Sequence, residues 1–181
     1  DNVELPVQVT IASGFPKGDK LEFITQKVTE LGASQIWAFP ADWSVAKWDG
    51  KKLGKKVEKL EKIALGAAEQ SKRNHVPSIT LFEKKADFLA RFDQFDRIVV
   101  AYEESAKEGE SAALLQAVSN LEKGAKLLFI FGPEGGLSPA EVENFQAKGA
   151  VLAGLGPRIL RAETAPLYAL SAISVLFELE K

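Results

Sequence analysis

Hydrophobic residues recur along the chain in two alternating patterns. Runs rich in Val, Ile and Phe predict strands, and these lie at residues 7–11, 36–39, 79–82, 97–101, 126–131 and 151–153. Between the strands, apolar residues three and four positions apart predict amphipathic helices, as at Leu21, Ile24 and Val28. Repeated alternation of strand and helix is typical of a mostly parallel sheet with helices on both faces. The sequence therefore predicts an α/β fold.

Three of the predicted helices have distinctive features. The helix that begins near Leu53 and ends near Gln70 is long and rich in lysine. Ser138 can cap the helix that follows residues 126–131, with proline at its first position and glutamate three residues after the serine. The last helix, residues 165–179, is rich in small residues, and Thr164 is placed to cap it. Shorter helices are expected at residues 86–92 and 112–121.

The composition excludes several classes of protein. The chain has 181 residues, of which 46% are hydrophobic and 27% charged, as expected for one globular domain. It has no cysteine, which excludes disulfides, thiolate nucleophiles and cysteine metal sites, and its one histidine argues against a metal site with several histidine ligands. We expect no metal site. The longest nearly apolar stretch, residues 167–177, is too short to span a bilayer. We expect a cytoplasmic location without membrane contact.

The chain contains no methionine and begins at Asp1. We therefore expect a segment of a longer protein, in which residues 1–6 are the end of an upstream linker and residues 7–181 form the folded domain.

The charge is unevenly distributed along the chain. The net charge is -2, but residues 47–75 hold nine basic against four acidic side chains. A basic segment on an acidic domain suggests contact with a polyanion. A lysine-rich helix that is merely solvated is the alternative.

Ligands of open α/β sheets bind beyond the carboxyl ends of the strands, and three loops in such positions are unusual. The first, residues 102–109, begins with Tyr102 and Glu103. The second, which we call the glycine loop, is Gly-Pro-Glu-Gly-Gly at residues 132–136. Its glycines allow close approach of the backbone to a ligand, although an ordinary glycine-rich turn is the alternative. The glycine loop lacks the Gly-Lys-Ser/Thr of a phosphate-binding loop.

The third loop, which we call the arginine loop, comprises residues 154–164. It brings Arg158, Arg161, Glu163 and Thr164 together just before a helix. Two arginines three residues apart suit anion recognition or stabilisation of developing negative charge, and a surface loop with a local Arg–Glu pair is the alternative. No serine has a nucleophile-elbow signature, which argues against a hydrolase triad through His75.

Five motifs occur in order along nearly the whole chain, and their combination is specific. They are Pro-Lys-Gly-Asp-Lys at 16–20, Gln-Lys-Val-Thr-Glu-Leu-Gly at 26–32, Glu-Gln-Ser-Lys-Arg-Asn at 69–74, the glycine loop, and Leu-Gly-Pro-Arg-Ile-Leu-Arg-Ala-Glu-Thr-Ala at 155–165. With these motifs the chain resembles the RsmE family, the 16S rRNA (uracil-1498-N3)-methyltransferases of the SPOUT class.

The resemblance implies properties that the residue pattern alone does not. Residues 7–181 would form a SPOUT methyltransferase domain with a C-terminal trefoil knot, for which the small residues of the last helix are suited. The cofactor would be S-adenosyl-L-methionine, released as S-adenosyl-L-homocysteine, and the substrate 16S rRNA in the small ribosomal subunit. The enzyme would be a homodimer with its site near the interface. An N-terminal PUA-like RNA-binding domain, absent from this chain, would precede it.

The resemblance also implies roles for individual residues. Arg161 or Arg158 would stabilise negative charge on the uracil, and Glu134 or Glu163 would orient an arginine or accept the N3 proton. RNA contacts would come from Lys47, Lys51, Lys52, Gln70, Lys72 and Arg73. The cofactor would be held by Tyr102, Glu103, Phe131, Gly132, Pro133, Glu134, Gly135, Gly136, Leu155, Gly156, Ile159, Leu160, Arg161, Thr164 and Ala165.

Two other functions remain as alternatives. A non-catalytic module of the same fold would bind RNA or a partner without turnover, but the intact glycine and arginine loops argue against it. An α/β domain that binds another adenine nucleotide is the second alternative. The missing phosphate-loop lysine argues against that one.

Overall fold

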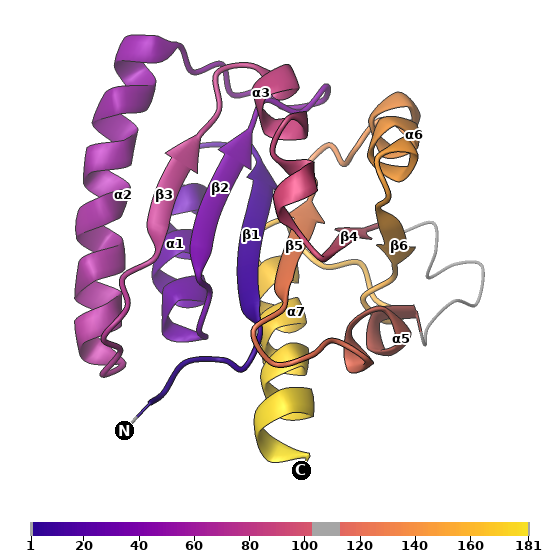
Figure 1. Ribbon diagram of the computed structural model, residues 1–181. Coiled ribbons are helices and arrows are strands. Elements are labelled where there is room, and N and C mark those ends of the chain that lie inside the picture. The colour runs from indigo at the N-terminus through magenta and orange to yellow at the C-terminus, as the bar shows by residue number, and fades with distance from the viewer. Residues whose placement is uncertain (1, 103–112, 181) are drawn as a thin grey trace.

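A computed structural model describes residues 2–102 and 113–180. The strands of this part form one six-stranded sheet in the order β3-β2-β1-β5-β4-β6, and every neighbouring pair is parallel (Figure 1). The predicted parallel α/β fold is confirmed, and each predicted strand overlaps an observed one. The strands are β1 (Gln8–Gly14), β2 (Gln35–Phe39), β3 (Ser78–Leu81), β4 (Arg97–Ala101), β5 (Lys126–Phe131) and β6 (Val151–Ala153).

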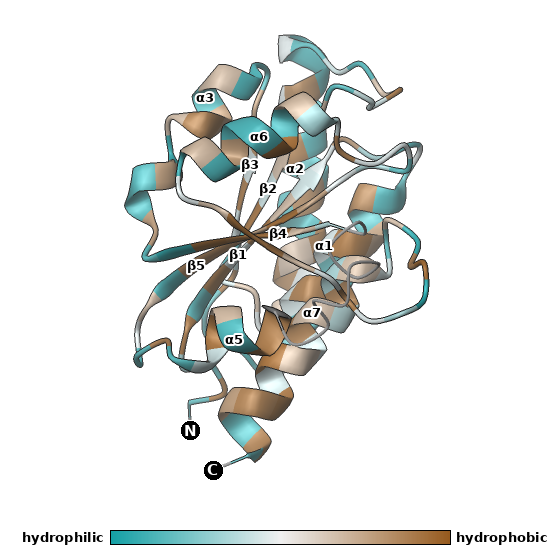
Figure 2. Ribbon diagram, turned by 90° about the vertical axis from the view of Figure 1, so that its right-hand side faces the viewer, coloured by the Kyte–Doolittle hydropathy of each residue, from teal (hydrophilic) through white to brown (hydrophobic). Residues whose placement is uncertain are grey.

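Helices cover both faces of the sheet, as predicted. One face carries α1 (Lys20–Glu30), α2 (Gly50–Gln70), α5 (Ala113–Ser119) and α7 (Ala165–Ser174). The other carries α3 (Lys85–Leu89) and α6 (Pro139–Ala147), whose outward sides are largely hydrophilic in Figure 2. A 3-10 turn, Phe92–Gln94, follows α3, and α7 widens into a π-helical turn, Val175–Leu179. No helix in the described ranges is both long and apolar enough to cross a membrane.

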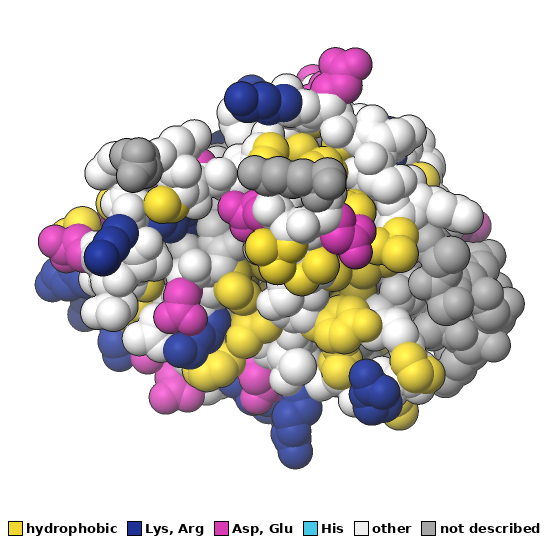
Figure 3. Space-filling model, turned by 90° about the horizontal axis from the view of Figure 1, so that it is seen from below, with side chains coloured by type: hydrophobic (Ala, Val, Ile, Leu, Met, Phe, Trp, Pro, Cys, Tyr) yellow, Lys and Arg dark blue, Asp and Glu magenta, His cyan; other side chains and the backbone are white. Residues whose placement is uncertain are grey.

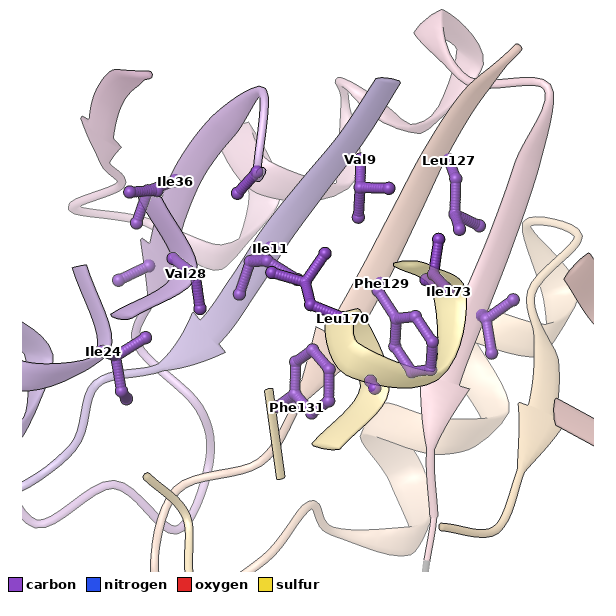
Figure 4. Packing of buried hydrophobic residues seen from close by; sticks show 14 of the residues in the cluster. Val9, Ile11, Ile24, Val28, Ile36, Leu127, Phe129, Phe131, Leu170 and Ile173 are labelled. Carbon is purple, nitrogen blue, oxygen red and sulfur yellow. The ribbon is translucent and has the colours of Figure 1, made fainter. Parts of the chain in front are cut away.

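The core between the sheet and α1 and α7 is aliphatic and aromatic. Figure 4 shows Leu170 and Ile173 of α7 pointing toward Phe129 of β5, with Ile24 and Val28 of α1 beside β1. All five of these side chains are fully buried. Because β5 is covered on both faces, its sequence is an almost continuous hydrophobic run rather than an alternating one.

The opposite face is held by a cluster of aromatic rings. Phe88 of α3 stacks on Phe39 of β2 with ring centroids 4.3 Å apart, and Phe145 of α6 meets both rings edge-on. Aromatic contacts of this kind add to the stabilisation that burial itself provides. This packing fixes α6, and therefore the glycine loop that connects β5 to α6.

The strand order places the carboxyl ends of three strands beside one another. β5 lies between β1 and β4, with Phe131 in register with Ser13 of β1. The carboxyl ends of β1, β5 and β4 consequently lie side by side at one edge of the sheet (Figure 1). Ligand sites of open parallel sheets lie beyond this edge.

Candidate functional site

A cleft of about 630 Å³ lies at the carboxyl ends of the central strands. The end of β4, the glycine loop and the arginine loop line most of it, and Lys20 and Trp43 complete it. Its volume is within the range of small-molecule and cofactor sites. Polar backbone from the loops and apolar side chains, among them Phe131, Leu155 and Leu160, share the lining.

Most of the predicted cofactor residues are brought together here. Thr164 is the exception among those that the structure describes, since it does not line the cleft, and Glu103 lies outside the described residues. Arg158, predicted only as a catalytic residue, also lines the cleft. The predicted residues found there are Tyr102, Phe131, Gly132, Pro133, Glu134, Gly135, Gly136, Leu155, Gly156, Ile159, Leu160, Arg161 and Ala165.

The expectation that the Thr164 side chain caps α7 needs correction. Its backbone is already helical, with φ -85° and ψ -37°, and its side chain makes no capping hydrogen bond to α7. A capping side chain normally stands on an extended residue, from which its oxygen reaches back to the first turn. Thr164 instead contributes its backbone carbonyl, which accepts the N–H of Tyr168 at 3.0 Å.

The glycine loop is shaped by close packing. A Cβ on Gly132 would lie 3.0 Å from the carbonyl carbon of Gly136, and one on Gly14 would lie 2.6 Å from Cδ of Pro133. Gly136 itself has φ +82°, a left-handed conformation that favours glycine. These glycines are therefore required by the shape of the loop and not only by a ligand.

The helix start predicted after the glycine loop is confirmed. The Ser138 hydroxyl accepts the backbone N–H of Glu141 at 3.1 Å, and the Glu141 carboxylate accepts the backbone N–H of Ser138 at 3.0 Å. This reciprocal capping box satisfies two N–H groups that a helix start otherwise leaves unpaired.

Glu134 is tied to the segment after β1. Its carboxylate accepts the backbone N–H of Lys17 at 3.1 and 3.2 Å and pairs with Nζ of Lys20 at 2.9 Å. Burial acts to raise the pKa of Glu134, but the bond from Lys20 and the backbone N–H groups of Glu134 and Lys17 outweigh it, so its pKa is lowered. Glu134 is thus a charged anchor of the glycine loop.

Lys20 and Trp43 are cleft residues that the sequence analysis did not assign. Lys20 follows the carboxyl end of β1, and Trp43 follows that of β2. Both residues follow the carboxyl end of a predicted strand, and this position could have identified them as candidate site residues. The sequence does not give the strand order, however, so it does not place the loops after β1 and β2 beside the loop after β5.

The arginine loop is the more exposed wall of the cleft. Arg158 and Arg161 are exposed, and 80% of the surface of Ile159 is accessible. Oε1 of Glu163 is buried, has no hydrogen-bond partner within the described ranges, and lies 3.9 Å from Nζ of Lys20. The lining of the cleft therefore includes two exposed arginines and a glutamate with one buried carboxylate oxygen that makes no hydrogen bond to the described residues.

The predicted RNA-binding residues do not form one patch. Lys47, Lys51 and Lys52 are exposed and lie at or just before the start of α2, the end of the helix that faces the cleft edge of the sheet (Figure 1). Gln70 and Lys72 are exposed at its other end, about 30 Å away for a helix of this length.

The structure corrects the prediction for Arg73. Its side chain is only 2% exposed and forms an ion pair with Glu4 at 2.5 Å. It also donates to the backbone carbonyl of Thr29 at 2.8 Å. A guanidinium engaged in this way has little surface to offer an RNA phosphate, and it holds the N-terminal segment on the domain instead.

Known proteins of similar sequence were compared with the chain. Residues 3–174 match the RNA methyltransferase domain family. The chain is 58% identical over 179 residues to ribosomal RNA small subunit methyltransferase E of Bacillus subtilis, covering 99% of this chain and 70% of that protein. It is 31% identical over 172 residues to the protein of that name from Mycobacterium bovis, covering 93% of this chain and 63% of that protein.

A solved structure agrees with this similarity. Ribosomal RNA small subunit methyltransferase E from Neisseria gonorrhoeae, bound to S-adenosyl methionine, superimposes with a TM-score of 0.76 at 26% identity. The superposition covers 98% of this chain and 70% of that one.

Proposed function

The chain belongs to the RNA methyltransferase family, and from this we propose that it transfers a methyl group from S-adenosyl-L-methionine to 16S ribosomal RNA of the small subunit. The observation that carries the proposal is the cleft in which the glycine and arginine loops meet. The Neisseria relative, which was solved with S-adenosyl methionine, supports the choice of cofactor.

The residues of the cleft fit this cofactor. Phe131, Leu155 and Leu160 provide apolar surface for an adenine ring, and the glycine loop brings backbone polar groups close to a ligand. When bound, the cofactor supplies a methyl group on a positively charged sulfur, and S-adenosyl-L-homocysteine remains after transfer.

We propose uracil N3, at position 1498, as the methyl acceptor. A new N3–C bond forms as the C–S bond breaks, and the proton on N3 must pass to a base. Negative charge that develops on the uracil carbonyl oxygens is then stabilised by Arg161 or Arg158. Both are exposed on the arginine loop and free to turn toward a substrate. Positioning of the two reactants in one cleft supplies much of the rate.

Glu163 suits the role of proton acceptor better than Glu134. Both oxygens of Glu134 are engaged, and its lowered pKa makes it a weaker base. Oε1 of Glu163 faces no donor within hydrogen-bond distance among the described residues. We therefore assign proton transfer to Glu163 and anchoring of the glycine loop to Glu134.

We further propose that the exposed lysines at the start of α2 guide ribosomal RNA to the cleft. Lys47, Lys51 and Lys52 are close in sequence to Trp43, which lines the cleft. Contacts between lysines and phosphates make binding strongly dependent on salt. Gln70 and Lys72 would contact a more distant part of the RNA, and a cytoplasmic location follows from a ribosomal substrate.

The apolar surface of α7 and of the π-helical turn that follows it supports a homodimer. Tyr168, Val175 and Leu179 are 38%, 44% and 74% exposed, and Figure 3 shows hydrophobic side chains gathered on the end of the molecule where the chain terminates. Exposed apolar surface of this kind is typical of an interface. Leu179→Asp is expected to shift the chain to monomer in sedimentation, whereas a monomeric wild-type chain would contradict the proposal.

We propose a trefoil knot at the C-terminal end. β6 is at the sheet edge beside β4, whereas α7 packs against β1 and β5 on the face of α1. The arginine loop must therefore cross the carboxyl ends of β4 and β5, where the glycine loop also lies. A knotted chain pulled from its two ends extends to a shorter contour length than an unknotted chain of 181 residues.

The domain assignment also stays a proposal. Residues 7–181 form the methyltransferase domain, and residues 1–6 are the end of a linker from a PUA-like RNA-binding domain. The ion pair between Glu4 and Arg73 would then fix the point on the methyltransferase domain at which the linker from the PUA-like domain arrives. An Arg73→Leu variant of the longer protein would loosen this junction, which small-angle scattering can detect.

Calorimetric titration of S-adenosyl-L-methionine into the chain tests the cofactor assignment. Saturable binding near one cofactor per chain is expected, and Gly135→Val should abolish it. A Cβ at position 135 would lie 3.1 Å from the carbonyl oxygen of Trp43, so valine has no room beside the cleft. The absence of binding by a folded wild-type chain would contradict the proposal.

Single-turnover methylation of small subunits that lack the modification tests the reaction. Mass spectrometry of the digested RNA should identify 3-methyluridine, and Arg161→Ala and Glu163→Gln should each slow its formation at least tenfold at saturating cofactor. Cofactor binding without any transfer would favour the non-catalytic alternative. Methylation of another nucleotide would remove the uracil assignment only.

A further inference from the structure

Trp43 differs from the other two tryptophans of the chain. Trp37 and Trp48 are 1% and 9% exposed, whereas Trp43 is 50% exposed and lines the cleft. An indole ring has a large apolar surface that folding normally buries. A half-exposed tryptophan at the opening of a ligand cleft is therefore a candidate contact for a substrate.

The backbone before Trp43 is held by buried polar groups. The N–H of Asp42 donates to Oε2 of Glu141 at 2.9 Å, and Glu141 is 1% exposed. The Ser138 hydroxyl donates to the Asp42 carboxylate at 2.5 Å, and Lys85 forms ion pairs with Asp42 and with Glu141. These hydrogen bonds and ion pairs fix the segment that contains Asp42 and Trp43 to α3 and to the start of α6.

The backbone on either side of the indole forms a closed turn. The N–H of Ser44 donates to the carbonyl of Ala41 at 3.1 Å, and the N–H of Ala41 donates to the Ser44 hydroxyl at 3.3 Å. The Trp43 carbonyl also lies close to Gly135, where a Cβ would be 3.1 Å away. The exposed ring is thus carried by a backbone with little freedom, which is how a binding group is preorganised.

Positively charged side chains close to Trp43 in the sequence indicate the class of ligand that the ring contacts. Lys47, Lys51 and Lys52 follow within ten residues and are all exposed. An aromatic side chain beside cationic ones is the combination that holds unpaired nucleotides, since bases stack on the ring while lysines meet the phosphates.

We infer that the Trp43 indole is a stacking platform for a nucleobase of the RNA substrate at the opening of the cleft. This inference rests on the proposed function, because it needs an RNA substrate in that cleft. Stacking uses the π-face of the ring and does not require a particular base. Trp43 is accordingly a positioning residue that binds the strand beside the target nucleotide, and Asp42 and Glu141 hold it in place.

Variants of Trp43 test the inference through substrate affinity. Trp43→Ala should raise the KM for small subunits about tenfold, and Trp43→Phe should recover most of the loss. The dissociation constant for S-adenosyl-L-methionine, measured by calorimetry, should be unchanged in both. Val45→Ala is the matched control, since Val45 is 63% exposed two residues away and does not line the cleft. Its KM should equal that of the wild type.

Intrinsic fluorescence gives a readout that does not depend on turnover. Trp43 is the one solvent-exposed tryptophan of the three, so stacking of a short single-stranded RNA should quench the wild type and leave Trp43→Phe unchanged. Addition of the cofactor alone should cause no comparable quenching.

Two results would overturn the inference. If Trp43→Ala weakens cofactor binding and leaves the KM for RNA unchanged, the indole contacts the cofactor instead. If Trp43→Ala changes neither, the ring contacts no substrate. In both cases the proposed function stands as long as the wild type binds cofactor and methylates RNA, so the two failures are distinguishable.

Discussion

The two walls of the cleft differ in how the protein holds them. The glycine loop is fixed by several contacts within the domain. Gly14 packs closely against Pro133, and the Glu134 carboxylate binds the backbone N–H of Lys17 and the side chain of Lys20. The capping box of α6 fixes the end of the loop. Its positions are set by packing and hydrogen bonds within the domain.

The arginine loop has few such restraints. Arg158, Ile159 and Arg161 are exposed. Near the end of the loop, the N–H groups of Thr164 and Ala165 donate to the carbonyl of Arg161, and the carbonyl of Thr164 accepts the N–H of Tyr168. An isoleucine with 80% of its surface accessible gains little from folding.

Because the two loops are held differently, substitutions in them should have different effects. The glycine loop is shaped before any ligand arrives, so changes in it should cost stability as well as binding. The arginine loop leaves Arg158, Ile159 and Arg161 exposed. Changes there should reduce ligand binding or reaction rate rather than stability.

The largest effect on stability is expected from Glu141→Ala. Glu141 is fully buried, caps α6 and pairs with Lys85 at 2.8 Å, so its removal leaves the half-buried Lys85 with one partner fewer and the backbone N–H groups of Asp42 and Ser138 without their acceptor. We expect the free energy of unfolding, measured with urea, to fall by about 3 kcal/mol. Glu143→Ala on the exposed side of the same helix is the control and should change it by less than about 0.5 kcal/mol.

Gly14→Ala should have the next largest effect. The added methyl would lie 2.6 Å from Cδ of Pro133, so the glycine loop must move. We expect a loss of about 1–3 kcal/mol in unfolding free energy, together with weaker cofactor binding. Gly54→Ala on α2, where a Cβ meets nothing within 4 Å, should instead gain up to about 1 kcal/mol. Equal effects of the two variants would contradict close packing at Pro133.

Acid should loosen the glycine loop through Glu134. Its pKa is lowered in the folded state from an ordinary value of 4.5, so the stability that it contributes is present above pH 4.5 and is lost as the pH falls through the lowered pKa. Asp42 acts in the same direction, because bonds from Lys85 and Ser138 lower its pKa. Glu134→Gln should therefore be less stable than the wild type at neutral pH, and the difference should shrink below pH 4.5.

Ile159→Ser on the arginine loop should have the smallest effect on stability. Ile159 is 80% exposed, so the free energy of unfolding should change by less than about 0.5 kcal/mol. Because Ile159 lines the cleft, cofactor binding should still weaken several-fold. A stability loss above 1 kcal/mol would mean that the arginine loop is held as firmly as the glycine loop.

Local pattern was sufficient for most of the fold. The strands predicted at residues 97–101, 126–131 and 151–153 have the observed bounds, and the capping box at Ser138 was visible in the sequence. These features depend on neighbouring residues, because burial period and helix capping act within a few positions. The glycine and arginine loops were identified for the same reason.

Contacts between distant residues explain what the sequence analysis missed. Arg73 belongs to a run of basic residues, but its partner Glu4 lies 69 positions earlier, and that pairing buries it. Lys20 and Trp43 enter the cleft only because β1 lies beside β5 and β2 lies beside β1 in the sheet. Thr164 does not cap α7 because the helical backbone begins one residue earlier than expected.

The sequence by itself determined the alternation of strands and helices, the absence of cysteine chemistry, and the positions of the glycine and arginine loops, since each depends on residue type and local spacing. Only the tertiary structure decided the strand order, the partners of Glu134 and Arg73, and the position of Trp43 beside the cleft. Packing of a sheet brings together residues that are far apart along the chain, and no local sequence pattern determines which residues meet.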